Sequence, residues 1–342
     1  MPNPISQRDS FWNKIYEIAR QDRRIVIVSA DMGAPALDRI RRDLPGQFIN
    51  VGIAEQNGIL VASGLAREGK RPFFYAIAPF AVFRPIELTR VNNAIMKIPI
   101  TIVGVGAGFS YEDSGPTHHL LEDIAVMRAF PNITLHSTSD AAMAAAVAEQ
   151  SCNWPVANYV RLDRQVLPDV HGETKLDFKA GFAVLRKGKQ AQLVATGYMV
   201  HKALKVADLL KADGIDVGVI DLFQLPCDGD ALVKQIKTAP KLFTLEEHFL
   251  PGGLGSAVLE MLSDRGAALP IMAGMTSRRW KPAVTVAAVI EQQGRYLLVE
   301  EETPEGLRLN NPAGHLDPGE SPEQAVAREA LEETAHVFQP RS

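Results

Sequence analysis

Residues 51–58 read Val51-Gly52-Ile53-Ala54-Glu55-Gln56-Asn57-Gly58, a short apolar stretch that turns through glycine into a segment of small residues. This pattern is typical of a strand that ends where a helix begins, with Glu55 at the junction. In an open sheet of parallel strands, such a junction lies at the carboxyl edge, where ligands bind. The alternative is that Glu55 only complements the helix dipole, which favours acidic residues in a first helical turn.

Strand-like and helix-like segments alternate along most of the chain on both sides of this stretch. Strands are expected at 25–28, 48–53, 72–77, 98–105, 192–196, 216–221 and 242–246, and helices at 10–19, 141–148, 201–212, 231–238 and 255–263. Ser139 and Asp140 offer N-caps to the alanine-rich helix. A Pro/Gly-containing connection at 167–175 interrupts the alternation. The pattern predicts two doubly wound α/β domains, at 1–168 and 176–280.

Composition excludes several classes of protein. The 342 residues are 46% hydrophobic with a net charge of −4, which supports packed cores and argues against a basic nucleic-acid-binding surface. No apolar run reaches the roughly 18 residues of a membrane span, and the first ten residues lack a signal-peptide pattern. Two cysteines, Cys152 and Cys227, are too few for a disulfide framework. We expect a cytoplasmic protein that binds neither nucleic acid nor membrane.

Residues 281–342 form a third segment that differs in charge. They hold five basic and eleven acidic side chains, a net charge of −6, whereas the remaining residues carry +2. Two β-rich runs, 283–290 and 296–299, predict a hairpin around Gln293-Gly294. Ser321, Pro322 and Gln324 predict a helix that begins with a capping box.

Three carboxylates share one face of this last helix, because Glu329, Glu332 and Glu333 follow the i, i+3, i+4 spacing. Oxygen ligands grouped in this way suit a hard cation such as Mg²⁺. A solvated acidic face has the same pattern, so both interpretations stay open.

Two further segments of the first domain carry side chains suited to catalysis. Phe80 and Phe83 offer flat rings that either stack on a heterocycle or belong to the core. The sequence EDSGPTHH (Glu112–His119) places two imidazoles in a polar turn, which suits proton transfer near neutral pH.

In their order, these motifs resemble the thiamine-diphosphate enzymes of the transketolase superfamily, including split transketolase subunits and 1-deoxyxylulose-5-phosphate synthase. The segments that match are SAD (Ser29–Asp31), GIAEQN (Gly52–Asn57), the aromatic segment, EDSGPTH (Glu112–His118) and RQVLP (Arg164–Pro168). The resemblance covers residues 6–279 and implies a pyrimidine-binding domain followed by a transketolase C-terminal domain.

The resemblance also implies roles for individual residues. Glu55 would hydrogen-bond the aminopyrimidine ring and so activate thiamine diphosphate. Phe80 would stack on that ring, with Phe83 beside it. His118 would be catalytic and would contact cofactor or donor hydroxyl groups. Asp31 and Arg164 would lie on the substrate side, where an arginine fork grips a sugar phosphate.

Two departures from the family pattern qualify this expectation. Gly106 stands near the place of a second family histidine, which puts ordinary ketol transfer between sugar phosphates in doubt. The GDG…N signature that binds diphosphate and Mg²⁺ is missing from the sequence. We therefore expect the C-terminal subunit of a split enzyme that transfers a two-carbon ketol unit, with cofactor and Mg²⁺ held mainly by an N-terminal partner subunit, as a heterotetramer or a dimer of heterodimers.

The C-terminal domain and the tail carry two more motifs. GGLGS (Gly252–Ser256), which follows Glu246-Glu247-His248, either cradles an anion or lets a strand and a helix approach closely. Gly314, Glu320, Arg328, Glu329, Glu332 and Glu333 match the Nudix box, with Ala335 where that family usually has glycine.

The Nudix resemblance implies Glu329, Glu332 and Glu333 as metal ligands, Arg328 as the holder of a neighbouring carboxylate and Glu320 as support for the loop. We expect a partial α+β Nudix-like segment at 281–342 without hydrolase activity, because a sheet that lacks strands has open edges and little core. The alternatives to a transketolase subunit are a Mg²⁺-dependent Nudix hydrolase of nucleoside diphosphate derivatives and a non-catalytic scaffold subunit.

Overall fold

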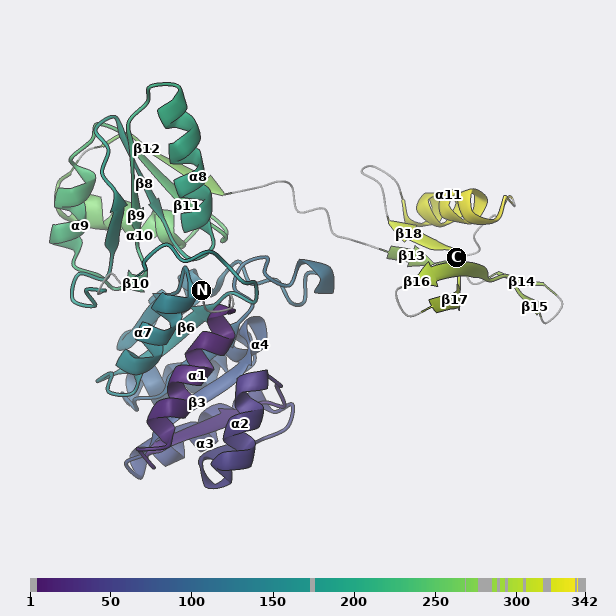
Figure 1. Ribbon diagram of the computed structural model, residues 1–342, viewed down its shortest axis with the longest axis horizontal. Helices are drawn as coiled ribbons and strands as arrows, with labels where there is room; N and C mark the ends of the chain where they lie inside the picture. The colour runs from purple at the N-terminus through teal and green to yellow at the C-terminus, as the bar shows by residue number, and fades with distance from the viewer. Residues whose placement is uncertain are drawn as a thin grey trace. The chain divides into compact units, whose positions relative to one another are not determined.

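The computed structural model describes residues 5–172, 176–267, 269–275, 285–287, 290–292, 295–303, 306–315, 321–335 and 337. The chain divides into two compact units, residues 1–276 and 277–342, each of which is described by itself (Figure 1).

The first unit contains a seven-stranded sheet in the order β10-β5-β6-β4-β3-β1-β2, in which all strands except β10 run parallel. Its strands are β1 (Ile25–Ser29), β2 (Phe48–Asn50), β3 (Arg71–Ile77), β4 (Thr101–Val105), β5 (Ile133–Ser137), β6 (Ala157–Leu162) and β10 (Gln224–Leu225). β1, β4, β5 and β6 are buried along their whole length, as expected for parallel strands with both faces covered.

Helices cover both faces of this sheet. Trp12, Leu37 and Val147 pack with Ile27 on one face, which places α1, α2 and α7 there. Ile59, Val82 and Met127 pack with Val28 on the other, which places α3, α4 and α6 there. The helices of this domain are α1 (Gln7–Ala19), α2 (Pro35–Asp43), α3 (Glu55–Arg67), α4 (Ala78–Phe83), α5 (Ile86–Leu88), α6 (Asp123–Arg128) and α7 (Ala141–Ser151), with the 3-10 turns η1 (Pro45–Gln47) and η3 (Glu112–Ser114) and the π-helix η2 (Thr89–Ile95).

A second sheet of five strands follows in the same unit, in the order β12-β11-β8-β9-β7, with only β7 antiparallel. Its strands are β7 (Ala183–Arg186), β8 (Ala191–Ala195), β9 (Val217–Asp221), β11 (Leu242–Glu246) and β12 (Ile271–Met275). α8 (Met199–Ala212) packs on one face, and α9 (Gly229–Ile236) and α10 (Leu254–Asp264) pack on the other. The two helix-covered parallel sheets confirm the predicted fold class.

The boundary between the two domains is less simple than the sequence pattern indicates. β10 follows β9 in the chain but pairs antiparallel with β5, so the second domain adds an edge strand to the first sheet. The predicted connection at 167–175 is described as far as residue 172. Asp140 alone caps α7, by accepting from the backbone N–H of Met143 at 2.7 Å, whereas Ser139 contacts the second domain.

The second unit contains three two-stranded pairings and one helix among its described residues. β13 (Thr285–Ala287) pairs with β18 (Ala313–His315), β14 (Glu291–Gln292) with β15 (Arg295–Tyr296), and β16 (Val299–Thr303) with β17 (Gly306–Asn310), all antiparallel. The predicted long hairpin is therefore wrong in extent: only β14 and β15 flank residues 293–294, which lie outside the described residues. α11 (Pro322–Thr334) has the predicted capping box at Ser321.

No helix in the described ranges is long and apolar enough to cross a membrane.

Candidate active site

Most of the candidate residues follow neighbouring strands of the first sheet. Asp31 follows β1, Glu55 follows β2, Phe80 and Phe83 follow β3, His118 follows β4, and Arg164 follows β6. Because these strands are parallel neighbours, the segments that follow them leave the sheet at its carboxyl edge. The topology thus brings residues that are more than 130 positions apart in sequence to one edge.

Glu55 is the first residue of α3, and its side chain is almost fully buried at 5% exposure. Its Oε1 atom accepts a hydrogen bond from Nη1 of Arg84 at 2.6 Å. One turn later, Gly58 lets α3 lie against β3, since a Cβ atom there would stand 2.3 Å from the ring of Phe74. The start of α3, and with it the Glu55 carboxylate, is therefore held tightly on the sheet.

The aromatic segment lies beside this carboxylate. The guanidinium carbon of Arg84 stands 4.0 Å from the centre of the Phe80 ring, and the same ring meets the edge of His118 with 5.3 Å between centroids. Phe83 is 38% exposed. The structure therefore connects Glu55, Phe80 and His118 through direct contacts, and Arg84 is the member of this group that sequence reasoning missed.

His118 is held by a loop that a glycine shapes. Nδ1 of His118 lies 3.0 Å from Oγ1 of Thr117, and the Tyr111 ring centre lies 5.9 Å from that of His118. Gly106 has a φ of +93°, and a Cβ atom there would meet the Tyr111 ring at 2.2 Å. Tyr111 thus fills the space at the position where the sequence lacks the family histidine. The neighbouring His119 packs edge-on against Phe109.

Arg164 reaches the same loop from the other side. Its guanidinium carbon lies 4.8 Å from the centre of the Tyr111 ring, and its Nη2 atom donates to Asp113 at 3.3 Å. The hydrogen bond from Arg164 lowers the pKa of the Asp113 carboxyl. Asp31 stands apart from this group: it adopts a φ of +56°, and its carboxylate accepts from Asn50 at 2.9 Å.

Buried polar groups support the loop from below. The hydroxyl of Ser110 donates to Asp163 at 2.9 Å and accepts from the backbone N–H of Arg164 at 2.8 Å. Asp123, the first residue of α6, accepts from Nε of Arg161 at 2.5 Å and from the hydroxyl of Tyr159 at 2.8 Å. These contacts fix the loop of His118 and the strand end that carries Arg164 relative to each other.

Glu247 reaches this region from the second domain. A Cβ atom on Gly108 would lie 2.3 Å from its Oε2 atom. Burial and the nearby charge of Asp163 raise the pKa of Glu247 to about 7. The two carboxyls line a cavity of about 10 Å³, the space of a single water molecule, so this place holds no room for a substrate.

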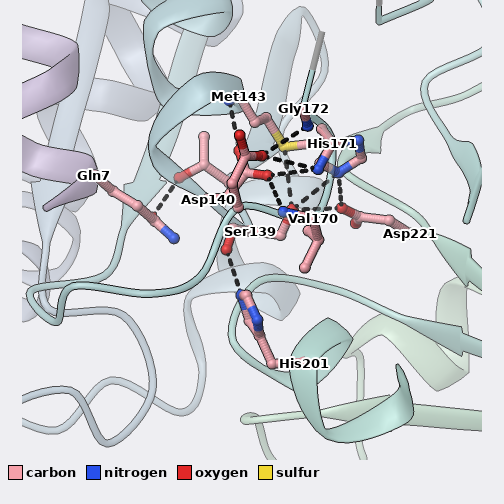
Figure 2. A network of polar contacts seen from close by, with 11 residues as sticks. Gln7, Ser139, Asp140, Met143, Val170, His171, Gly172, His201 and Asp221 are labelled. Carbon is pink, nitrogen blue, oxygen red and sulfur yellow. Dashed lines mark hydrogen bonds and ion pairs between the residues drawn. The ribbon is translucent and has the colours of Figure 1, made fainter. Parts of the chain in front are cut away.

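A second buried network joins the domains through the connecting segment (Figure 2). Nε2 of His171 lies 2.9 Å from Asp221 and 3.1 Å from Oγ of Ser139, which itself donates to Asp221 at 2.7 Å. Asp140 accepts from the backbone N–H groups of Val170 and His171. A catalytic triad uses both ring nitrogens of its histidine, whereas here one nitrogen faces both partners. The trio is therefore a structural clamp.

The charge of Asp221 determines the protonation of this clamp. Burial lowers the pKa of His171, but the hydrogen bond and the charge of Asp221 outweigh that effect, so the net pKa is raised.

The glycine-rich segment of the second domain serves packing. Both carboxylate oxygens of the buried Glu246 accept backbone N–H groups at the start of α10, from Leu254 and Gly255. A Cβ atom on Gly253 would lie 2.2 Å from Glu246. The anion at this helix terminus is thus a side chain of the protein itself, which favours the close-approach interpretation of GGLGS over an anion cradle.

On α11 of the second unit, Arg328 lies among the predicted metal ligands. Its Nη1 atom donates to Glu329 at 2.7 Å and to Glu332 at 3.3 Å. No group of three His, Cys, Asp or Glu side chains within the described ranges is arranged to hold a metal ion. The carboxylates thus fit an ion pair with Arg328 as they stand, and not a metal. Glu320 lies outside the described residues.

Comparison with known proteins identifies the class to which this fold and site belong. The transketolase pyrimidine-binding domain matches residues 3–169, the transketolase C-terminal domain matches residues 181–275, and the NUDIX domain matches residues 279–341. One of the two subunits of the apulose-4-phosphate transketolase of Phocaeicola vulgatus is 36% identical over 265 residues, which cover 77% of this chain and 85% of that protein.

Other relatives agree with this result. The 6-deoxy-6-sulfo-D-fructose transketolase subunit SqwH of a Clostridium species is 34% identical over 260 residues, covering 75% of this chain and 80% of that protein. The 1-deoxy-D-xylulose-5-phosphate synthase of Crocosphaera subtropica is 34% identical over 279 residues, but the match spans only 43% of that longer protein. A solved split-gene transketolase, described as an inactive β4 tetramer, superposes with a TM-score of 0.73 at 33% identity, covering 80% of this chain and 89% of that one.

The chain therefore belongs to the transketolase family, and within it to the C-terminal subunits of split transketolases.

Proposed function

We propose that this chain, together with an N-terminal partner subunit, transfers a two-carbon ketol unit with thiamine diphosphate, and that Glu55 faces the aminopyrimidine ring of that cofactor. The observation that carries the proposal is the buried carboxylate of Glu55 beside the face of Phe80. The family implies the cofactor, and the named split subunits imply a partner.

The fit of the residues to an aminopyrimidine can be judged from what now contacts them. The planar guanidinium of Arg84 lies on Phe80 and donates N–H to Glu55. An aminopyrimidine is likewise planar and, in its activated form, donates N–H. The site is therefore suited to a flat nitrogen heterocycle that stacks on one side and hydrogen-bonds at its edge.

Each residue has a defined task under this proposal. Thiamine diphosphate, when bound, supplies a carbon acid that becomes the nucleophile. Glu55 would hold a proton at its carboxylate, His118 would contact hydroxyl groups of the donor, and Arg164 would bind the phosphate of a sugar phosphate in place of Asp113. Asp31 would lie at the substrate side.

An exposed apolar patch around Glu55 supports the need for a partner. The large side chains Ile53, Leu60, Phe83, Ile86 and Ile95 are all exposed. They come from the segment before α3 and from α3, α4, α5 and η2, and α3 contacts both α5 and η2. Apolar surface of this kind commonly marks a protein interface. We propose that the patch meets the N-terminal subunit, which would carry the GDG…N signature, bind diphosphate through Mg²⁺, and work with this chain in the cytoplasm.

Reconstitution with that partner tests the proposal. Glu55→Gln keeps the shape of the side chain but removes its charge, so we expect ketol transfer to fall by about 10²-fold or more. Glu68→Gln at the exposed end of the same helix is the control and should behave as wild type. Undiminished transfer by Glu55→Gln would favour the scaffold alternative.

A Nudix hydrolase is the second candidate function, favoured by the family match at residues 279–341. Because Arg328 pairs with Glu329 and Glu332, we expect the purified chain to release no phosphate from nucleoside diphosphate derivatives in the presence of Mg²⁺. Mg²⁺-dependent hydrolysis that Glu332→Gln abolishes would establish this function instead.

A further inference from the structure

Arg84 occupies the place that the proposed cofactor ring requires. Its guanidinium lies 4.0 Å from the centre of the Phe80 ring, and its Nη1 atom donates to Glu55 at 2.6 Å. A flat ring that stacked on the same face of Phe80 and hydrogen-bonded the same carboxylate oxygen would collide with this guanidinium. The two arrangements exclude each other.

The backbone of Arg84 is fixed while its side chain keeps access to solvent. Arg84 follows α4 directly in the helical region, with φ −62° and ψ −45°, and its carbonyl oxygen accepts from the side chain of Gln56 at 3.1 Å. The side chain is 44% exposed, whereas that of Glu55 is 5% exposed. A long side chain on a fixed backbone at the protein surface can turn into water without disturbing α4.

The chemistry of Glu55 explains why the free chain needs such a group. A carboxylate this well buried is costly unless it is paired and hydrogen-bonded. Among the described residues, Arg84 is the one whose side chain is seen to hydrogen-bond it. The planar fork of an arginine supplies both a stacking surface and a donor, which a lysine ammonium does not.

We infer that Arg84 is a placeholder: in the free chain it stacks on Phe80 and neutralises Glu55, and it must turn away before an aminopyrimidine ring can bind there. This inference rests on the proposed function, since it assumes that Glu55 and Phe80 receive the ring. It adds that ring binding is an exchange of one planar N–H donor for another. Arg84 therefore weakens binding while it keeps the empty site stable.

The test measures binding of 4-amino-2-methylpyrimidine to the full chain by ligand-observed NMR titration. Arg84→Met removes the charge and the planar donor but keeps much of the side-chain length. We expect it to bind the fragment about tenfold more tightly than wild type, the combined effect of losing one ion pair and one cation–π contact that compete with the ring. Arg84→Lys should fall between the two. Arg90→Met, on the exposed side of η2, is the matched control and should bind as wild type.

Two further measurements keep the outcomes separate. Circular dichroism shows that each variant is folded, and Arg84→Gln replaces Arg84→Met if the latter is not. Equal or weaker binding by the folded Arg84 variant would overturn the inference, because Arg84 would then not compete with the ring. In Glu55→Gln/Arg84→Met the gain should disappear. If the double variant binds as tightly as Arg84→Met, Glu55 does not receive the ring and the proposed function fails independently.

Discussion

The buried ion pair between Asp123 and Arg161 should be one of the most sensitive points of the first unit. Asp123 is fully buried, and Arg161 is 4% exposed. Asp123→Ala removes the acceptor of both the Arg161 Nε–H and the Tyr159 hydroxyl, which leaves Ser137 as the remaining hydrogen-bond partner seen for the Arg161 side chain. The variant therefore leaves an uncompensated charge and an unpaired hydroxyl in the core.

We expect Asp123→Ala to lower the free energy of unfolding by about 3–5 kcal/mol, the usual effect of removing one partner of a buried pair. The double variant Asp123→Ala/Arg161→Met removes the charge as well as its partner. Its loss should therefore be smaller than the sum of the two single losses by about 1–3 kcal/mol.

Urea unfolding followed by tryptophan fluorescence measures these losses, because Trp12 and Trp154 lie in the first unit. The exposed pair Arg186–Asp208 provides the control: Asp208→Ala should change the unfolding free energy by less than about 1 kcal/mol. A loss below about 1 kcal/mol for Asp123→Ala, or single losses that simply add, would refute the reasoning.

Three other variants test the remaining arguments by urea unfolding. Because the pKa of Glu247 is raised from 4.5 to about 7, the native state binds a proton that the unfolded chain has released, so stability should fall as pH rises between these values, and Glu247→Gln should flatten that fall. The raised pKa of His171 means that its stabilising contribution is complete below pH 6.5 and is lost as pH rises through the native pKa, so His171→Gln should lose more stability at about pH 6 than at about pH 9. Within α3, Gly58→Ala would collide with Phe74 and should destabilise by about 1–3 kcal/mol, whereas Gly64→Ala meets open space and should stabilise by about 0.5–1 kcal/mol. Equal effects of the two glycine variants would contradict the packing described for α3.

The sequence predicts those features of the fold that depend on local pattern. The buried run at β1, the alanine-rich helix α7 and the capping box of α11 are each visible in a few consecutive residues, because hydrophobic period and cap chemistry are local properties. The placement of Glu55 at a strand-to-helix junction follows from the same kind of pattern.

Contacts between distant segments could not be predicted in this way. Arg84 stands 29 positions from Glu55, and nothing in the residues around it indicates that pairing. Tyr111 fills the space beside Gly106 only because a loop turns back on itself, and β10 joins the first sheet across a domain boundary. The carboxylate of Glu246 takes the start of α10, which the glycines alone left open between two interpretations. Each of these features depends on tertiary structure that one sequence does not encode in a readable pattern.

Burial distinguishes the ion pairs near the candidate site by their roles. Glu55–Arg84 and Asp113–Arg164 each contain an arginine that is at least 40% exposed, whereas Asp123–Arg161 is sealed in the core. An ion pair with one side in water contributes little stability and can be exchanged for a ligand at small cost. A sealed pair cannot be opened without leaving a buried charge. The same chemistry therefore serves two purposes at one sheet edge: the half-exposed pairs hold groups that a cofactor and a phosphate would claim, and the buried pair keeps the loop that carries them in place.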